Sequence, residues 1–497
     1  MKRNIKQLSD KIFDIAIIGG GIYGAALVRE AAMRGLSAAL IDKGDFCCAT
    51  SANSLKIIHG GLRYLQQADI IRVRESVRER HAMLRIAPHL IRPLPCIMPT
   101  IGIFKSKPSM FAGLLANDIL SFDRNYGVNP DKHIPRGKII SRDAMDDIVP
   151  NYTLSGTGAA FWTDAVADNS ERIVVEMIKS AVTAGACAAN YVEMIGFLKD
   201  GDKITGIKAH DCIDKTDFEI QAKLVINATG PWSNKVLEKL DGTVTPLPYS
   251  LALGMNAILK KELIPTYAAG VPCQEEGPNK GRLMFIVPWQ GTTMGGTFYR
   301  HFSEGVDNLN PTEQDIQSLV NQLNSSLPNA QIEAEDITRI HAGLLPCKPS
   351  RDLESEPKLL MHYKLVDHAK ADGVDGLVTV LGVKYTTARD VAERTINLVA
   401  KKLGEAIAKS ATATTPLPAS LSHETANSDA PEILLEAIKN EMPQTLSDLI
   451  YRRSVIGGRG VPPQKQLEQC ADIMSKELGW SNERQKTEID GCQKINV

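Results

Sequence analysis

The sequence has little of what marks a membrane span, a disulfide scaffold or a nucleic-acid-binding protein. Its 497 residues carry 57 basic and 58 acidic side chains, so no net field favours nucleic acid or anionic lipid. The nine cysteines contain no CxxC pair, which argues against a metal site or a disulfide framework and favours a reducing compartment. No apolar run approaches the roughly 18 residues that span a bilayer. We therefore expect a cytoplasmic protein of two or three domains.

The most informative stretch is residues 13–42. It begins with an apolar run of strand length at 13–18, which ends in a glycine cluster at 19–24. An alanine-rich helical segment follows, and a second apolar run, 36–41, ends at Asp42. Strand, glycine turn, helix, strand and acid in this order predict an α/β dinucleotide-binding domain with a Rossmann-type sheet.

The small and acidic residues of this stretch each have a physical role in such a domain. Gly19 permits the tight turn, Gly21 lets the backbone approach a pyrophosphate, and Gly24 lets the helix pack closely on the strand. The unpaired amides and the dipole at the helix N-terminus attract the phosphates. Asp42 can accept hydrogen bonds from a ribose diol, and the small hydroxyl residues Thr50 and Ser51 can surround the phosphates beyond it.

Four further segments follow in order along nearly the whole chain, and with the glycine cluster they resemble one family. These segments are Ala49-Thr50-Ser51 with His59-Gly60-Gly61-Leu62-Arg63-Tyr64-Leu65, then Ala87-Pro88-His89-Leu90, Asn227-Ala228-Thr229-Gly230-Pro231-Trp232, and Gly382-Val383-Lys384-Tyr385-Thr386-Thr387-Ala388-Arg389. Together they resemble the FAD-dependent glycerol-3-phosphate dehydrogenases and oxidases, which belong to the D-amino-acid-oxidase-like flavoproteins. The resemblance implies FAD as the cofactor and a secondary alcohol as the hydride donor to flavin N5.

The resemblance and the local patterns divide the chain into a Rossmann-type FAD-binding domain, an inserted antiparallel-sheet substrate domain and a C-terminal helical domain. Residues 100–150 form an insertion with a short apolar helix at 110–122, which suits the membrane face of the family and a buried position equally. The expected boundaries are 1–99, 151–243 and 341–404 for the FAD-binding domain, 100–150 for the insertion, 244–340 for the substrate domain, 405–430 for a linker and 431–497 for the helical domain.

The resemblance also implies which residues hold the cofactor. His59 and Gly60 lie in a turn that suits positioning of the flavin, and Val192 is the expected backbone contact to adenine. Thr229 and Gly230 follow a buried strand and point at the cofactor. Gly382, Lys384 and Thr386 form a turn, a cation and a helix start that together supply positive charge to a reduced flavin.

The helix expected from Asp69 to Ile86 carries many arginines that alternate with glutamates. Arg72 and Arg80 are among them, as is Glu79. We interpret this pattern as a solvated face linked by salt bridges, with an anionic partner surface as the alternative.

For the substrate side, the resemblance assigns Arg63 and Lys384 to a substrate phosphate. Two departures weaken the assignment. The chain has Asn256 where the family has a histidine in a Gly-Ser-His segment, and an amide orients a hydroxyl but is no base at neutral pH. It has Leu345 where the family has the arginine of Gly-Val-Arg-Pro. His341 is a candidate replacement base and His59 a second one, and Lys348 or Arg351 could replace the lost cation.

These departures keep the substrate open. Each lost charge-assisted contact costs about 1.5–3 kcal/mol, so two losses could change the substrate. The leading hypothesis is oxidation of glycerol 3-phosphate to dihydroxyacetone phosphate, with quinone or oxygen as electron acceptor. The rivals are an amine or amino-acid oxidase and a non-catalytic flavin-binding protein; a tRNA-modifying flavoprotein is disfavoured by the neutral charge. Peripheral contact with the inner membrane face and a homodimer are compatible with the sequence.

Overall fold

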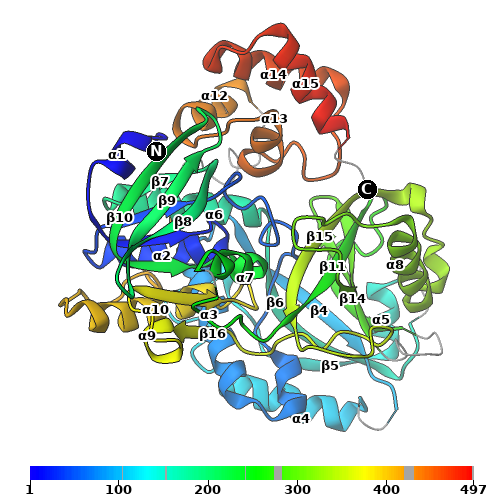
Figure 1. Cartoon of the computed structure of the whole chain (residues 1–497). Helices are drawn as coiled ribbons and strands as arrows, with labels where there is room; N and C mark the ends of the chain where they lie inside the picture. Colours follow the sequence, from blue (N-terminus) through cyan, green and yellow to red (C-terminus); the bar gives the residue numbers. More distant parts are fainter. Residues whose placement is uncertain (103–104, 151–153, 241, 274–281, 419–429, 495–497) are drawn as a thin grey trace.

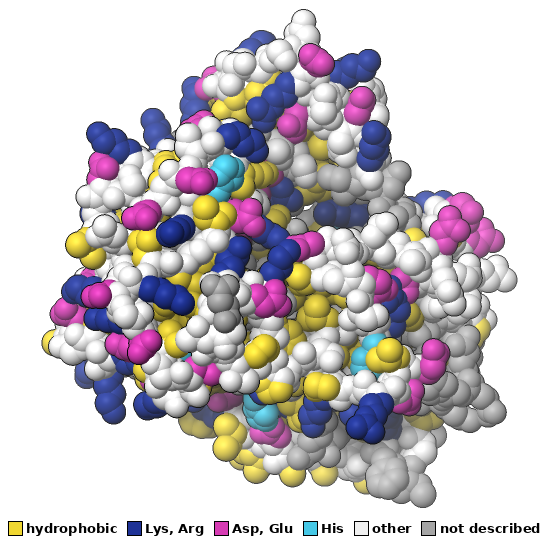
Figure 2. Space-filling view, viewed as in Figure 1, with side chains coloured by type: hydrophobic (Ala, Val, Ile, Leu, Met, Phe, Trp, Pro, Cys, Tyr) yellow, Lys and Arg dark blue, Asp and Glu magenta, His cyan; other side chains and the backbone are white. Residues whose placement is uncertain are grey.

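Two large sheets and a C-terminal group of helices make up the protein, as shown by a computed structural model (Figure 1). The structure describes residues 1–102, 105–150, 154–240, 242–273, 282–418 and 430–494. In the described residues, no helix combines the length and the apolar character needed to cross a membrane. Charged side chains of both signs are interspersed over the face in Figure 2, in line with the near-zero net charge.

The first sheet is the expected Rossmann-type sheet. Its strands follow the order β16-β17-β10-β1-β2-β7, and the five strands from β17 to β7 are parallel. Their inner residues are apolar and buried on both faces, which explains the continuous apolar runs in the sequence. The bounds are β1 (Phe13–Ile18), β2 (Ala38–Ile41), β7 (Cys187–Ala189), β10 (Thr216–Asn227), β16 (Lys364–Asp367) and β17 (Leu377–Leu381), with β8 (Val192–Asp200) and β9 (Lys203–Asp211) joining as an antiparallel extension of β10.

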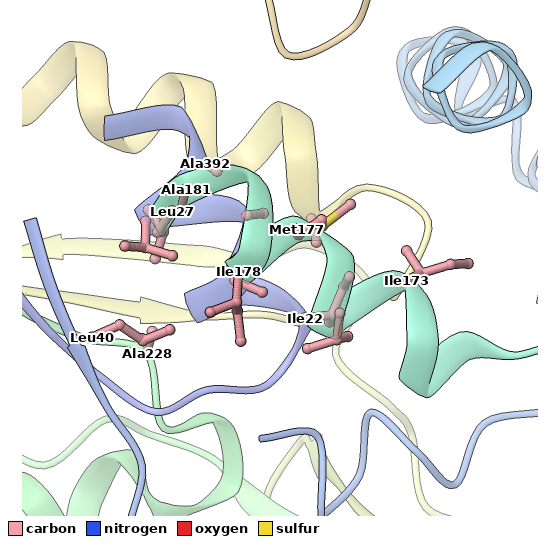
Figure 3. Packing of buried hydrophobic residues seen from close by; sticks show 14 of the residues in the cluster. Ile22, Leu27, Leu40, Ile173, Met177, Ile178, Ala181, Ala228 and Ala392 are labelled. Atoms are coloured by element: carbon pink, nitrogen blue, oxygen red, sulfur yellow. The ribbon is translucent and has the colours of Figure 1, made fainter. Parts of the chain in front are cut away.

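Three helices pack together against this sheet: α2 (Ile22–Met33), α6 (Ser170–Thr183) and α10 (Ala388–Leu403). Figure 3 shows part of this packing, with Leu27 of α2, Ile178 and Ala181 of α6 and Ala392 of α10 in one buried apolar cluster. The small side chains let α2 approach its neighbours closely, and its first turn is thereby held at the carboxyl end of β1. This packing fixes the position of the start of α2 beside the glycine turn.

The second sheet is largely antiparallel and supplies the expected substrate domain. Its order is β15-β11-β14-β13-β12-β4-β6-β3, with β5 on β6. Helix α8 (Glu313–Ser326) covers it and begins in a capping box between Thr312 and Asp315. The bounds are β3 (Ile57–Ile58), β4 (Ile91–Pro99), β5 (Lys138–Ser141), β6 (Gly158–Ala167), β11 (Ser250–Leu259), β12 (Ala268–Pro272), β13 (Leu283–Trp289), β14 (Thr292–Phe302) and β15 (Ile337–Cys347).

The sheets divide the chain at different places from the expected boundaries. Strands β4 and β6 lie in the second sheet, although the expected FAD-binding domain contained residues 1–99 and 151–243. The cause is the long-range pairing of β4 with β12 and β6, which no local pattern reveals. The domain boundaries therefore follow the tertiary pairing and not the order of motifs.

Helix α3 (Ile70–Ile86) begins at the Asp69 cap as expected, but its charged face is not uniformly solvated. Arg72, Glu79 and Arg80 are buried. Arg80 pairs with Asp164 at 2.6 Å, and Glu79 pairs with Arg389 at 2.6 Å. The expectation of a solvated face was wrong for these residues: β6 and α10 supply the partners of Arg80 and Glu79, and Arg72 packs on Tyr64 of η1 (Leu62–Gln67).

The insertion places α4 (Lys107–Leu120) at the surface. Met110 and Leu114 face the protein, whereas Phe111, Leu115 and Ile119 are each more than half exposed. The helix therefore buries one side and presents an apolar stripe on the other. The remaining elements are α1 (Ile5–Ser9), η1 (Leu62–Gln67), η2 (Pro130–Lys132), α5 (Arg142–Ile148), η3 (Gly230–Trp232), α7 (Ser233–Leu237), η4 (Glu238–Leu240), η5 (Pro328–Ala330), η6 (Ala334–Asp336) and α9 (His368–Ala371).

The C-terminal helices form a small core of their own and are held to the first sheet by buried ion pairs. Arg452 and Arg453 bind the Asp45 carboxylate at 2.6 and 2.7 Å, and Arg172 binds Glu441 at 2.5 Å. Residues 419–429 of the expected linker lie outside the described part. The bounds are α12 (Pro431–Asn440), α13 (Leu446–Asp448), η7 (Leu449–Arg453), α14 (Gln464–Leu478) and α15 (Asn482–Gln493).

Candidate active site

A cavity of about 1530 Å³ lies between the two sheets and draws its lining from both. Typical small-molecule sites measure about 300–1,000 Å³, so this one has room for a dinucleotide together with a small substrate. Most of the residues predicted from the sequence line it. They are Gly19, Gly21, Asp42, Thr50, Ser51, His59, Arg63, Val192, Thr229, Gly230, Asn256, Gly382 and Lys384.

One wall of the cavity is the turn between β1 and α2 with the acid that ends β2. Both carboxylate oxygens of Asp42 accept backbone hydrogen bonds, from Gly20 at 2.6 Å and from Gly44 at 2.9 Å. Burial raises the pKa of Asp42 to about 6. Gly24 does not line the cavity; a Cβ there would lie 1.7 Å from the Gly19 carbonyl oxygen, so it serves the close packing of helix on strand.

A second turn, 382–384, meets the first at the side chain of Tyr23. The Tyr23 hydroxyl donates to the Lys384 carbonyl at 2.9 Å and lies 3.2 Å from the Val383 amide, which donates to it. A Cβ on Gly382 would lie 2.1 Å from the Tyr23 ring, so only glycine fits. Thr386 is buried and does not line the cavity, and α10 begins at Ala388, two residues later than expected.

The side chain of Lys384 enters the cavity over the ring of Tyr64, with Nζ 4.0 Å from the ring centroid. Burial and the nearby Arg72 guanidinium lower the pKa of Lys384 to about 7. The Arg72 guanidinium stacks on the same ring, with its Cζ 3.8 Å from the centroid. Tyr64 thus gathers two cations beside the cavity.

His59 and Gly60 occupy different positions relative to the cavity. His59 lines it with its ring edge-on to Tyr64 at 5.8 Å, and burial lowers the pKa of His59 to about 4. Gly60 lies behind the wall, where its amide donates to Asp164 at 2.6 Å. A Cβ on Gly60 would lie 2.4 Å from the Arg80 guanidinium, so this glycine makes room for the buried ion pair.

The opposite wall comes from the second sheet. Asn256 on β11 is buried and lines the cavity; its Oδ1 accepts from the Thr297 hydroxyl at 2.7 Å, and its Nδ2 donates to the Asn53 carbonyl at 3.4 Å. These contacts fix the orientation of the amide. Lys348 lines the cavity near its exposed end, whereas Arg351 does not line it.

The structure does not place His341 with the other candidates. Its side chain lies 1% exposed on β15, edge-on to Trp289, and it does not line the cavity. Burial, together with Lys56 and Arg339, lowers the pKa of His341 well below its ordinary value. His341 shares one face of β15 with residues 343 and 345 and is the cross-strand partner of Asn256, but it lies further along the strand, beyond the residues that line the cavity. A role for His341 as replacement base stays a prediction that its buried position outside the cavity does not favour.

Comparison with known proteins defines the family. The profile described as FAD dependent oxidoreductase matches residues 14–387, which is most of the chain. The chain belongs to this family. It is 32% identical to a glycerol-3-phosphate dehydrogenase of Synechocystis over 84% of this chain and 75% of that protein. It is 34% identical to an alpha-glycerophosphate oxidase of Streptococcus pneumoniae over 69% of this chain, but spans only 56% of that oxidase.

The fold of this FAD-dependent oxidoreductase also matches a solved structure. The crystal structure of the glycerol-3-phosphate dehydrogenase from Bacillus halodurans, complexed with FAD, aligns with a TM-score of 0.75 over 99% of this chain and 96% of that chain, at 22% identity. At this identity the likeness concerns the fold. It confirms the expected architecture of an FAD-binding domain, a substrate domain and C-terminal helices.

The cavity of this flavoprotein fits FAD on its own geometry. The Asp42 carboxylate lines the cavity, where it can bind a ribose. A Cβ on Gly21 would lie 3.0 Å from the Ser51 hydroxyl oxygen, so the glycine leaves room for the backbone to approach a pyrophosphate. Val192 lies beside Asp42, where its amide donates to the Asp42 carbonyl at 2.7 Å, and the 382–384 turn with Lys384 lines the same cavity. Asp42 and Val192 would hold the adenosine, the glycine turn the phosphates, and the 382–384 turn the flavin.

Sequence reasoning missed several side chains of this oxidoreductase's cavity. Arg72, Arg282 and Tyr299 line it, and so do Trp162 and Asp164. Arg72 is one of several arginines in a helix of alternating charges, so nothing in the sequence distinguishes it as a cavity residue. Arg282 precedes an apolar run and belongs to no motif. Only the charge of Arg282 beside a strand of the substrate domain could have pointed to it.

Proposed function

We propose that this protein oxidises a secondary alcohol of a small anionic substrate, with glycerol 3-phosphate as the leading candidate and dihydroxyacetone phosphate as its product. The observation that carries the proposal is one cavity that joins the dinucleotide fingerprint to cationic side chains, Arg63 and Lys384 among them. The names of the relatives support the substrate. Because the chain spans little more than half of the streptococcal oxidase, the whole activity of that oxidase is part of the proposal.

In this mechanism each residue has one task. Arg63 binds the anionic end of the substrate, since a guanidinium offers paired donors to phosphate or carboxylate. Asn256, held by Thr297, donates from its amide to orient the substrate hydroxyl. Bound FAD supplies the hydride acceptor at N5.

Lys384 is the proton acceptor in this proposal. With a pKa of about 7, it is partly neutral at physiological pH, whereas His59, with a pKa of about 4, is a weak base. Taking the hydroxyl proton makes Lys384 cationic. The 382–384 turn would then present positive charge to bound FAD, and such charge stabilises the reduced, anionic form of a flavin.

Anaerobic bleaching of the flavin tests the function. Glycerol 3-phosphate added to the purified yellow protein should bleach the band at about 450 nm. Bleaching by glycine, sarcosine or proline, and not by glycerol 3-phosphate, would instead support the amine oxidase. A flavin that none of these compounds reduces would support the non-catalytic flavin-binding protein.

The proposal for the electron acceptor is based on the exposed apolar side of α4. Phe111, Leu115, Ile119 and Phe122 are 51–81% exposed along one side of α4 and its C-terminal end, while Met110 and Leu114 of the same helix line the cavity. We infer a peripheral contact with the inner membrane face, from which a quinone reaches the cavity. Flotation with liposomes tests the contact: Phe111→Ser with Phe122→Ser should abolish it, and oxygen-dependent turnover without lipid would support oxygen as acceptor.

The same proposal places the protein in the cytoplasm. No disulfide joins any of the nine cysteines, all of which lie in the described residues. Thiols that remain reduced are typical of a reducing compartment.

A further inference from the structure

The apolar side chain of Leu345 lies at a defined place in the substrate wall. A Cβ on Gly254 of β11 would lie 2.7 Å from Leu345 Cδ1 and 3.0 Å from Tyr299 Cε1. Leu345 on β15 and Tyr299 on β14 therefore converge over this glycine from the two strands that flank β11. Both line the cavity, so the position of the missing cation is next to the Tyr299 ring.

Arg282 contacts the same ring. It directly precedes β13, the neighbour of β14 in the sheet, and its guanidinium lies 4.8 Å from the Tyr299 centroid. The side chain is 7% exposed and lines the cavity. Arg63 is close enough to contribute, with burial, to a lowered pKa of Arg282. Two arginines thus flank the substrate end of the cavity.

The hydrogen bonding of Arg282 is incomplete. Nη2 donates to the Thr297 carbonyl, and Nε lies 3.5 Å from Glu356, a side chain that is 38% exposed. Nη1 is buried and has no hydrogen-bond partner among the described residues. An unsatisfied buried donor on a cation is costly, and such groups persist where something else satisfies them.

A neighbouring arginine shows what a structural role looks like in this sheet. Arg300 on β14 binds both oxygens of Asp315, at 2.6 and 3.1 Å, and Glu304 at 2.7 Å. Its charge is neutralised by carboxylates of the protein. Arg282 has one distant and partly exposed carboxylate, so its charge is left for a ligand.

We propose that Arg282 anchors the anionic group of the substrate and takes over the task of the arginine that Leu345 replaces. The inference rests on the proposed function and deepens it, since it assigns the phosphate end of the substrate to the space between Arg63 and Arg282. It also makes Arg282 the residue that selects phosphorylated over unphosphorylated alcohols. A phosphate oxygen there can accept from a guanidinium that the protein leaves incompletely bonded.

The test is calorimetric titration of the FAD-loaded protein with inorganic phosphate, followed by flavin reduction with glycerol 3-phosphate. Arg282→Met should weaken phosphate binding about 10- to 100-fold. It should raise the substrate concentration for half-maximal reduction by a similar factor. Arg351→Met is the matched control, because this exposed arginine does not line the cavity, and should bind phosphate as the unaltered protein does.

Two further variants separate anion binding from folding. Arg282→Lys keeps the charge but not the fork, so its phosphate affinity should lie between those of the unaltered protein and Arg282→Met. Leu345→Arg on the Arg282→Met background should recover phosphate affinity while FAD content stays constant. Equal phosphate affinity in the unaltered protein and Arg282→Met, or no phosphate binding at all, would overturn the proposal. Phosphate binding that depends on Arg282 without reduction by glycerol 3-phosphate would uphold the anion site and reject the proposed substrate.

Discussion

The two walls of the cavity are built in different ways. The cofactor wall comes from a few short motif segments, and many of its contacts are made by the backbone: the amides of Gly20 and Gly44 hold Asp42, and Gly24 packs against the carbonyl of Gly19. The substrate wall takes single side chains from β11, β13, β14 and β15, which lie next to one another in the sheet but far apart in the sequence.

This difference explains why one wall keeps its motif and the other does not. A backbone contact depends on a narrow set of residues, because a Cβ at Gly24 or Gly382 has no room. A side-chain contact can be supplied by any strand that reaches the same place. Arg282 and Leu345 meet around Tyr299, so a cation can move from one strand to another without altering the fold.

The largest effect is expected from a substitution that disrupts the cofactor wall. Gly24→Ala places a Cβ 1.7 Å from the Gly19 carbonyl oxygen, and neither backbone segment can move without losing the turn. We expect protein that retains no FAD, measured as the ratio of flavin to protein absorbance. Gly491→Ala is the control, since a Cβ there meets nothing within 4 Å. Full FAD content in Gly24→Ala would show that the wall tolerates side chains after all.

The next effect concerns the junction of the two walls at Lys384. Lys384→Met should slow flavin reduction about 10²- to 10⁴-fold, as expected for loss of a proton acceptor. Lys384→Arg should not restore the rate, because arginine stays protonated. Stopped-flow measurement of reduction at saturating substrate checks both variants. A rate within threefold of the unaltered protein in Lys384→Met would remove Lys384 from this task.

The pH dependence sharpens the same point. The neutral amine is the active form, so kcat/KM should rise with pH, tenfold per unit below the Lys384 pKa of about 7, and level off above it. Lys384→Met should lose this rise and keep only the effect of the substrate phosphate, which ionises at about pH 6. A rise of kcat/KM as the pH falls would contradict a lysine acting as base.

A smaller effect is expected at Asn256, on the substrate wall. Asn256→Ala removes a hydrogen bond that orients the hydroxyl and should lower kcat/KM about tenfold. Thr297→Val, which removes the hydroxyl that holds the Asn256 amide at 2.7 Å, should lower it less, about threefold. Equal losses of kcat/KM in both variants would show that Asn256 contributes only while Thr297 holds its amide in position.

The same contrast describes what could be predicted from the sequence. Strands β1 and β2, the glycine turn and the Asp69 cap follow from local patterns, and the structure contains them. The membership of β4 and β6 in the second sheet depends on pairing with distant strands, which no local pattern contains. The alternating charges of α3 indicated a solvated face, and only the packing of β6 and α10 shows that Glu79 and Arg80 are buried.

For the site, the sequence located residues that belong to motif segments and missed side chains that have no motif. Thirteen of the expected cofactor and substrate residues line the cavity, together with Lys348, one of the two expected replacements for the lost cation. Arg282 was missed because it has no motif, and its burial beside Tyr299 exists only in the folded sheet. His341 was favoured by its place two residues before Gly343, and residues two apart do share one face of a strand, but the sequence does not show how far along that face the cavity extends.

The smallest expected effect tests that last point. Neither ring nitrogen of His341 makes a hydrogen bond among the described residues, and the side chain packs against Trp289 away from the cavity. His341→Leu replaces an unsatisfied buried group by an apolar one of similar size, so reduction by glycerol 3-phosphate should stay within about twofold and thermal stability should be equal or higher. A loss of more than tenfold, together with loss of the rise of kcat/KM with pH, would move the proton acceptor from Lys384 to His341 and place the base on the substrate wall.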